Sequence, residues 1–127
     1  MLITDQKTVA QIKEEFHKKF PGLKIEFYKT EHRKYTASSD DDMIASHFKI
    51  GEVRNIHDSK EFKINPESTV AEIESTLADV FGLNVQIYRR SNTLWLQTSA
   101  TDDWTLEKQN AKGLRSMQSD VGLYDKT

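Results

Sequence analysis

The chain of 127 residues contains no cysteine. Disulfides, thiolate catalysis and cysteine-based zinc or iron-sulfur sites are therefore excluded. Metal sites made of histidine and carboxylate stay possible, but the four histidines lie in separate segments, and none of them forms a pair at metal-ligand spacing. They are His17, His32, His47 and His57. We expect no metal and no cofactor.

Glycine and long hydrophobic runs are also scarce. The five glycines form neither GxGxxG nor GxxxxGK[ST], so the sequence predicts no glycine-rich phosphate-binding loop. No stretch approaches the roughly 20 apolar residues that a transmembrane helix needs. The first residues lack the basic and apolar regions of a secretory signal. We therefore expect an intracellular, cytoplasmic protein with no membrane partner.

A strong excess of one charge is missing as well, since 18 Lys and Arg stand against 20 Asp and Glu. A domain that binds duplex nucleic acid through its phosphates is usually much more basic, so the composition disfavours that partner. Hydrophobic residues make up 36% of the chain. A chain of this length and composition can bury the core of one domain without disulfides or metals.

What the sequence does contain is an internal repeat. Thr69-Val70-Ala71-Glu72-Ile73 stands 61 residues after Thr8-Val9-Ala10-Gln11-Ile12, and each follows a short strand-like segment. Each is followed by a helical pattern, a Phe-Pro-Gly-Leu or Phe-Gly-Leu stop, and an alternating run that ends in tyrosine and a basic residue. Similarity over this length indicates two related halves, residues 1–29 and 62–90.

Within each half the pattern predicts strand, helix and strand. Thr8 and Thr69 each precede a Gln or Glu by three residues, which is the capping-box signature of a helix start. Apolar residues at helical spacing follow in both halves: Val9, Ile12, Phe16 and Phe20, and Val70, Ile73, Leu77 and Phe81. Expected strands are 2–4, 23–29, 61–65, 83–89 and 93–98, and a third helix is expected from 104 to about 114.

Two βαβ units in tandem predict an α+β fold, a two-layer, ferredoxin-like sandwich with strand order 4-1-3-2. Both repeat helices would cover one face. An extra C-terminal hairpin strand, next to strand four, and the third helix complete a single domain over 1–115, with a flexible tail over 116–127. The alternative is another strand order, with the third helix covering part of the second face.

The face away from the repeat helices is the candidate binding site. Strand alternation places on it Lys24, Glu26, Tyr28, Gln86, Tyr88 and Trp95. If Ser91-Asn92 is the hairpin turn, Tyr88 stands opposite Trp95. Aromatic and amide groups on an open sheet can stack single-stranded bases or bind another protein. The alternative is that the third helix or the long loop covers this face.

Acidic clusters have simpler explanations than catalysis or metal binding. Asp102-Asp103 fits the start of the third helix, and Asp40-Asp41-Asp42 lacks the alternating ligands and glycine of a calcium loop. Residues 30–48 are polar with little periodicity, and we expect a mobile loop there.

These observations favour a small, non-catalytic binding or adaptor module that contacts a protein partner or associates with itself. Two alternatives stay open. One is a single-stranded nucleic-acid binder that uses the open sheet face. The other is an enzyme or small-ligand protein with a pocket under the 30–48 loop. The sequence does not specify the partner, the pathway or the oligomeric state.

Overall fold

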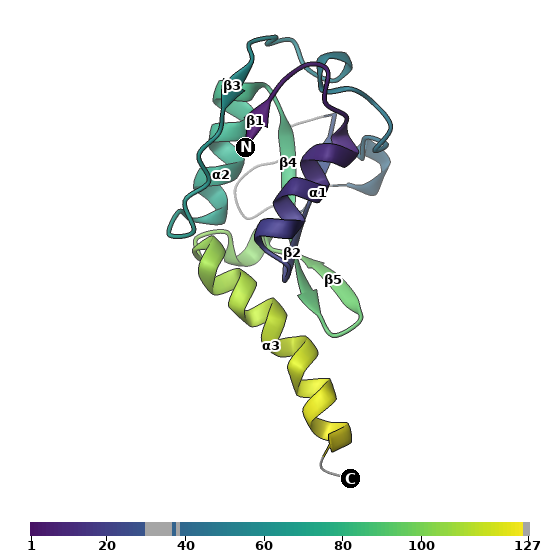
Figure 1. Cartoon of the computed structure of the whole chain (residues 1–127), viewed down its shortest axis with the longest axis vertical. Coiled ribbons are helices and arrows are strands. Elements are labelled where there is room, and N and C mark those ends of the chain that lie inside the picture. The colour runs from purple at the N-terminus through teal and green to yellow at the C-terminus, as the bar shows by residue number, and fades with distance from the viewer. Residues whose placement is uncertain (30–36, 38, 126–127) are drawn as a thin grey trace.

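The computed structural model (Figure 1) describes residues 1–29, 37 and 39–125, and side chains only up to residue 118. Among these residues the helices are α1 (Val9–Lys19), α2 (Val70–Phe81) and α3 (Leu106–Asp125). The strands are β1 (Leu2–Ile3), β2 (Leu23–Tyr28), β3 (Lys60–Glu61), β4 (Asn84–Ser91) and β5 (Leu94–Gln97). Short 3₁₀ turns occupy Asp40–Asp42, Ile50–Glu52 and Ser99–Thr101.

Both repeat helices begin as the sequence predicts. The Thr8 hydroxyl accepts a hydrogen bond from the Gln11 N–H at 3.2 Å, and the Thr69 hydroxyl accepts one from the Glu72 N–H at 3.1 Å. Each capping box is complete, because the Gln11 and Glu72 side chains also accept a bond from their cap residue's backbone. Reciprocal bonds of this kind satisfy two donors that the first helical turn leaves without a partner.

The strands form two antiparallel sheets, so the fold is α+β. In the described residues β1 pairs with β3, and a second sheet has the order β2-β4-β5. The predicted single sheet of order 4-1-3-2 is therefore wrong, and with it the ferredoxin-like arrangement. That order would place β1 beside β4 and β3 beside β2, whereas each strand instead pairs with its equivalent in the other half.

The register of this pairing is symmetric between the halves. Glu26 pairs with Gln86, its counterpart 60 residues on, and Phe27 and Val85 pair on one side of it as Ile25 and Ile87 do on the other. At the small sheet the Phe62 N–H donates to the carbonyl of Met1, 61 residues earlier, at 2.8 Å. The two halves thus meet through equivalent positions at both sheets.

Backbone segments after β2 and β5 complete the helix starts in the same way. The Val9 N–H donates to the Phe48 carbonyl at 2.9 Å, and the Val70 N–H donates to the Trp104 carbonyl at 3.0 Å. Because the first N–H groups of a helix have no partner within it, these bonds fix each returning segment against its helix.

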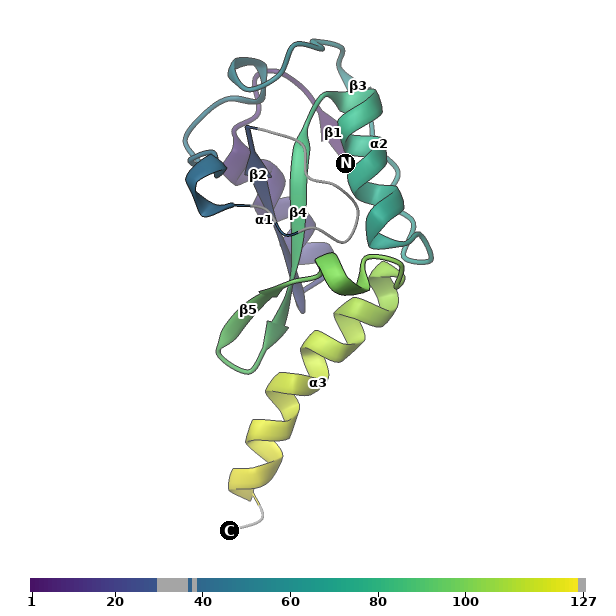
Figure 2. The same ribbon diagram turned by 180° about the vertical axis from the view of Figure 1, so that it is seen from behind.

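Apolar side chains from both halves fill one core. α1 packs on β2 and α2 packs on β4, and Figure 2 shows these strands from behind, with α1 on their far side. The largest fully buried apolar side chains are Ile3, Ile12, Phe16, Leu23, Ile25, Phe27, Ile50, Leu77, Leu83, Ile87 and Leu106. The predicted helical stripes therefore face the interior, as does Phe81, which is 3% exposed.

α3 is longer than the sequence predicted, and it starts later. Its first turn is capped by Thr105, whose hydroxyl accepts a bond from the Lys108 N–H at 3.1 Å, and not by Asp102 or Asp103. The helix extends away from the rest of the chain past the β4–β5 hairpin (Figure 1). The expected tail from residue 116 thus begins within α3, and its flexibility stays a prediction.

Two further boundaries differ from the prediction. β3 lies at Lys60–Glu61 and not at 61–65, because pairing with β1 ends where the chain turns toward α2. In the hairpin Ser91 pairs with Leu94, so the turn residues are Asn92 and Thr93, and Asn92 adopts a left-handed conformation with φ of 55°.

Candidate functional site

The six side chains predicted to share a sheet face come together on it. Glu26 pairs with Gln86, and Lys24 pairs with Tyr88. The Lys24 ammonium lies 4.9 Å from the centre of the Tyr88 ring and 5.3 Å from the centre of the Trp95 ring. The hydroxyl groups of Tyr28 and Tyr88 share a hydrogen bond. Trp95 stands opposite Arg90 and not opposite Tyr88.

This face is not open, which corrects the sequence-based expectation. Gln86 is fully buried, Tyr28 is 2% exposed, and Tyr88 and Glu26 are each 7% exposed. Only Lys24 and Trp95 are half-buried. Alternation along a strand identifies the face to which a side chain belongs, but it contains no information about what covers that face.

The buried polar groups satisfy one another. Glu26 forms ion pairs with Lys13 from α1 and, at 3.7 Å, with Lys24. Burial raises the pKa of Tyr28 well above its usual value, and the hydrogen bond with Tyr88 raises it further. Both tyrosines therefore stay neutral at physiological pH, and their bond holds β2 to β4. This arrangement is structural and leaves no free group for a ligand.

A cluster that sequence reasoning missed joins Asp5, Arg54 and His57. Arg54 donates to the Asp5 carboxylate at 2.9 Å and to the Phe81 carbonyl at 3.1 Å, and the His57 ring lies 2.8 Å from the same carboxylate. Burial acts to raise the pKa of Asp5, but the hydrogen bonds from Arg54 and His57 outweigh it and lower the pKa. The cluster connects the β1–α1 turn to the end of α2.

The second half has a contact in the corresponding place. The Asn110 side chain of α3 accepts a bond from the Gly22 N–H, at the end of α1, at 2.7 Å. Each returning segment thus ties the end of the other half's helix. The Asp5 cluster has this structural role, and no spacing in the sequence indicates it, because Asp5 and Arg54 are 49 residues apart.

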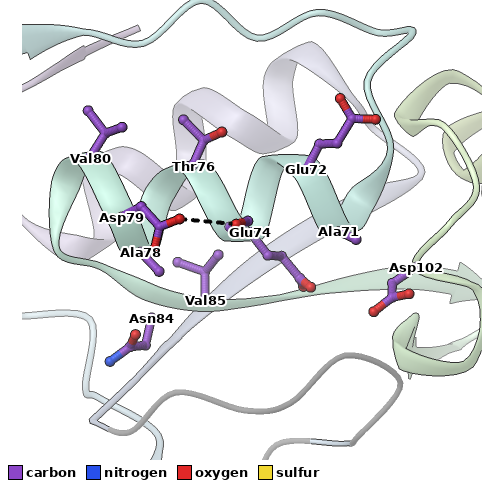
Figure 3. Close-up of a pocket in the computed structure, with 11 residues that line it drawn as sticks. Ala71, Glu72, Glu74, Thr76, Ala78, Asp79, Val80, Asn84, Val85 and Asp102 are labelled. Carbon is purple, nitrogen blue, oxygen red and sulfur yellow. Dashed lines mark hydrogen bonds between the residues drawn. The ribbon is translucent and has the colours of Figure 1, made fainter.

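A hollow of about 600 Å³ lies along α2 and the first residues of β4 (Figure 3). Its lining is rich in carboxylates and includes Glu72, Glu74, Asp79 and Asp102. Glu72 points to the opposite side of α2 from Val85 in the close-up. Glu74 accepts a bond from the Ile87 N–H at 3.0 Å and so continues the hydrogen bonding of β4. The lining groups do not converge on one point.

No group of three His, Cys, Asp or Glu in the described part of the chain is placed to hold a metal ion. No described helix is long and apolar enough to cross a membrane. The pocket expected under the 30–48 loop involves residues 30–36 and 38, which lie outside the described residues.

β5 presents the most distinctive exposed surface. It is the last strand of its sheet in the described residues, and Leu94 and Leu96 are 64% and 42% exposed. We call Leu94, Trp95, Leu96 and Gln97, with the outer backbone of this strand, the β5 edge. No charged residue stands between Arg90 and Asp102. Natural edge strands usually carry charges or proline that prevent pairing with another strand, and this one carries neither.

The two tryptophans lie beside cations. The Arg90 guanidinium lies 5.2 Å from the centre of the Trp95 ring. Lys108, Arg89 and Lys112 lie 4.0, 5.5 and 5.6 Å from the centre of the Trp104 ring. Such contacts stabilise the cation over the ring face, at about 0.5 to 1 kcal/mol each at exposed sites.

Comparisons with protein-family models, with curated proteins and with solved structures found no match.

Proposed function

We propose that the protein is a non-catalytic binding module that contacts a protein partner through the β5 edge. The observation that carries this proposal is the pair of exposed leucines on an uncharged terminal strand. An extended segment of a partner can add to such an edge by main-chain hydrogen bonds, while its side chains pack on the leucines. The exposed leucines, more than the buried tyrosines, are the surface that a partner can reach.

The proposal includes a duplicated architecture. Equivalent capping boxes, equivalent strand pairing and equivalent bonds to the helix starts support two copies of one unit. In the first half the segment after β2 returns along that strand, since the Ile44 N–H donates to the Phe27 carbonyl at 2.7 Å. In the second half the corresponding segment is β5, which is longer. The second copy therefore supplies the binding edge.

Leu94→Lys with Leu96→Lys tests the proposal. Two lysines on an edge strand oppose the addition of another strand, and both positions are exposed, so stability should change little. We expect the immobilised variant to lose the proteins that the wild-type chain retains from a lysate of the source cells. The matched control is Val80→Lys, which changes a 40% exposed apolar residue on α2.

Retention of the same proteins by the double-lysine variant would overturn the proposal. Equal loss from the Val80→Lys control would also overturn it, because a general loss of apolar surface would then explain the result. Circular dichroism melting of all three proteins verifies that each is folded.

Single-stranded nucleic acid is a second candidate, and the cations around Trp104 favour it. Bases stack on exposed indoles while nearby cations contact the phosphates. Three cations beside one half-buried ring fit that chemistry. Titration with an oligothymidylate, followed by tryptophan fluorescence, should then quench the wild type but not Trp104→Phe. No quenching at low salt would exclude this candidate.

A further inference from the structure

We infer that the partner at the β5 edge is a second copy of this chain, and that the two β5 strands pair antiparallel about a two-fold axis between their Trp95 residues. This inference rests on the proposed function and names its occupant. Paired in this way, the sheets β2-β4-β5 of two copies would form one continuous six-stranded sheet.

Hydrogen-bond alternation determines which backbone groups of β5 point outward. Ser91 and Leu94 close a two-residue turn and so form a hydrogen-bonded pair, and alternate pairs along an antiparallel ladder repeat this. Leu96 therefore also bonds to β4, as does Thr98, whose N–H donates to the Ile87 carbonyl at 3.1 Å. The N–H and carbonyl of Trp95 are directed away from β4, toward an added strand.

Symmetry then restricts the register. Identical antiparallel strands must pair so that outward-directed residues face outward-directed residues, and a two-fold axis must pass through one position. With the axis at Trp95, the two Trp95 backbones exchange both hydrogen bonds. Leu94 then stands directly opposite Leu96 of the second copy, and Leu96 stands opposite its Leu94. All four exposed leucines meet in two non-hydrogen-bonded pairs, where side chains approach most closely.

The charge pattern permits this self-pairing. Identical strands place identical charges near each other, and like charges directly opposite destabilise a strand pair. β5 and its flanks avoid this penalty, because the nearest charges in sequence are Arg90 and Asp102. Arg90 lies on β4, one strand away from the proposed axis, with its guanidinium over the Trp95 ring.

α3 supports the leucine contact from one side. Leu96 pairs with Arg89, so their side chains lie on the same face, and the Arg89 guanidinium donates to Gln109 of α3 at 2.7 Å. α3 therefore begins on the face that bears the leucines, yet it leaves Leu94 64% exposed. In the pair of chains, two α3 helices would flank the four leucines and exclude water from their sides.

Single cysteines in this cysteine-free chain test the register directly. In the inferred pairing, residues 94 and 96 of different copies have Cα atoms about 4.5 Å apart, which a disulfide can bridge. Two residues 94 would be roughly 8 Å apart, beyond its reach. We expect an oxidised mixture of Leu94→Cys and differently tagged Leu96→Cys chains to form the mixed dimer, and neither variant alone to form much.

The control is Val80→Cys, which places an exposed thiol on α2. Mixed cross-linking no higher than with this control, or cross-linking of Leu96→Cys only with itself, would overturn the inferred pairing. Sedimentation of the wild type should show a concentration-dependent dimer. Leu96→Lys should raise its dissociation constant at least about tenfold, as expected for the lost burial of one leucine.

The same experiments separate this inference from the proposed function. A wild type that stays monomeric but still captures other proteins through the β5 edge would refute self-pairing alone. A wild type that stays monomeric and captures nothing in a β5-dependent way would refute both.

Discussion

Tyr28 and Tyr88 show how burial decides the role of a residue that the sequence marks as a binding candidate. Their rings are almost fully buried and their hydroxyls bond to each other. Replacing both with serine empties two aromatic sites in the interior, and emptying one such site typically costs about 3 to 5 kcal/mol. We therefore expect the double variant to be strongly destabilised in urea melts.

Lys29→Ser is the matched control, because it changes an exposed side chain next to β2. If the double variant melted within a few degrees of the wild type, the tyrosines would not be core residues, and a binding role for them would return.

Asp5 contributes a pH dependence. Its hydrogen bonds with Arg54 and His57 lower its pKa in the folded protein, so the folded state binds a proton less readily than the unfolded chain. A lowered pKa stabilises the fold above the ordinary value of about 4, and that contribution disappears as the pH falls through the lowered pKa. Asp5→Asn should therefore destabilise the protein at pH 7 and make little difference in strong acid.

Urea melts of the wild type and Asp5→Asn at pH 7, 5 and 3 measure this difference. The exposed Asp103→Asn is the control. A gap between wild type and Asp5→Asn that stayed constant down to pH 3 would show that the Asp5 charge does not contribute to stability.

At the scale of elements, α3 crosses the start of β2 at two glycines. A Cβ atom on Gly113 would lie 2.4 Å from the carbonyl oxygen of Gly22, which is closer than real Cβ contacts. Glycine to alanine within a helix normally stabilises by about 1 kcal/mol. Here we expect the opposite sign, because the new methyl group would push α3 away from β2.

Thermal melts of Gly113→Ala and of the exposed Lys112→Ala compare the clash with ordinary helix propensity. Gly113→Ala should lower the melting temperature, and Lys112→Ala should change it little. A higher melting temperature for Gly113→Ala would mean that the close approach is relieved without cost.

Helices and hairpin differ in how far the sequence could predict them. The capping boxes at Thr8 and Thr69 are local signals, and both helices begin there. The hairpin exists as predicted, but its turn lies at Asn92 and Thr93, one residue later. That change shifts the pairing by two residues, and because side chains alternate with period two, Trp95 stays on the predicted face.

At the scale of the whole molecule, the sequence could not predict strand order. β2 and β4 have the same alternating pattern, and so both the expected order and the observed β2–β4 pairing bury Ile25, Phe27, Val85 and Ile87. Periodicity reports which side chains are buried and not against which strand. The β5 edge was missed for a related reason, since exposure depends on where a strand lies in its sheet.

The pairing of equivalent strands has a consequence for how fast the chain folds. Leu2 pairs with Glu61 and Glu26 with Gln86, so each sheet forms only after about 60 residues of chain have been closed into a loop. Loop closure costs entropy before any pairing returns it, and proteins dominated by such distant pairs refold in milliseconds to seconds. Stopped-flow refolding should give this range, whereas a submillisecond phase that recovers all native fluorescence would show that local helix formation, and not the meeting of the two halves, limits folding.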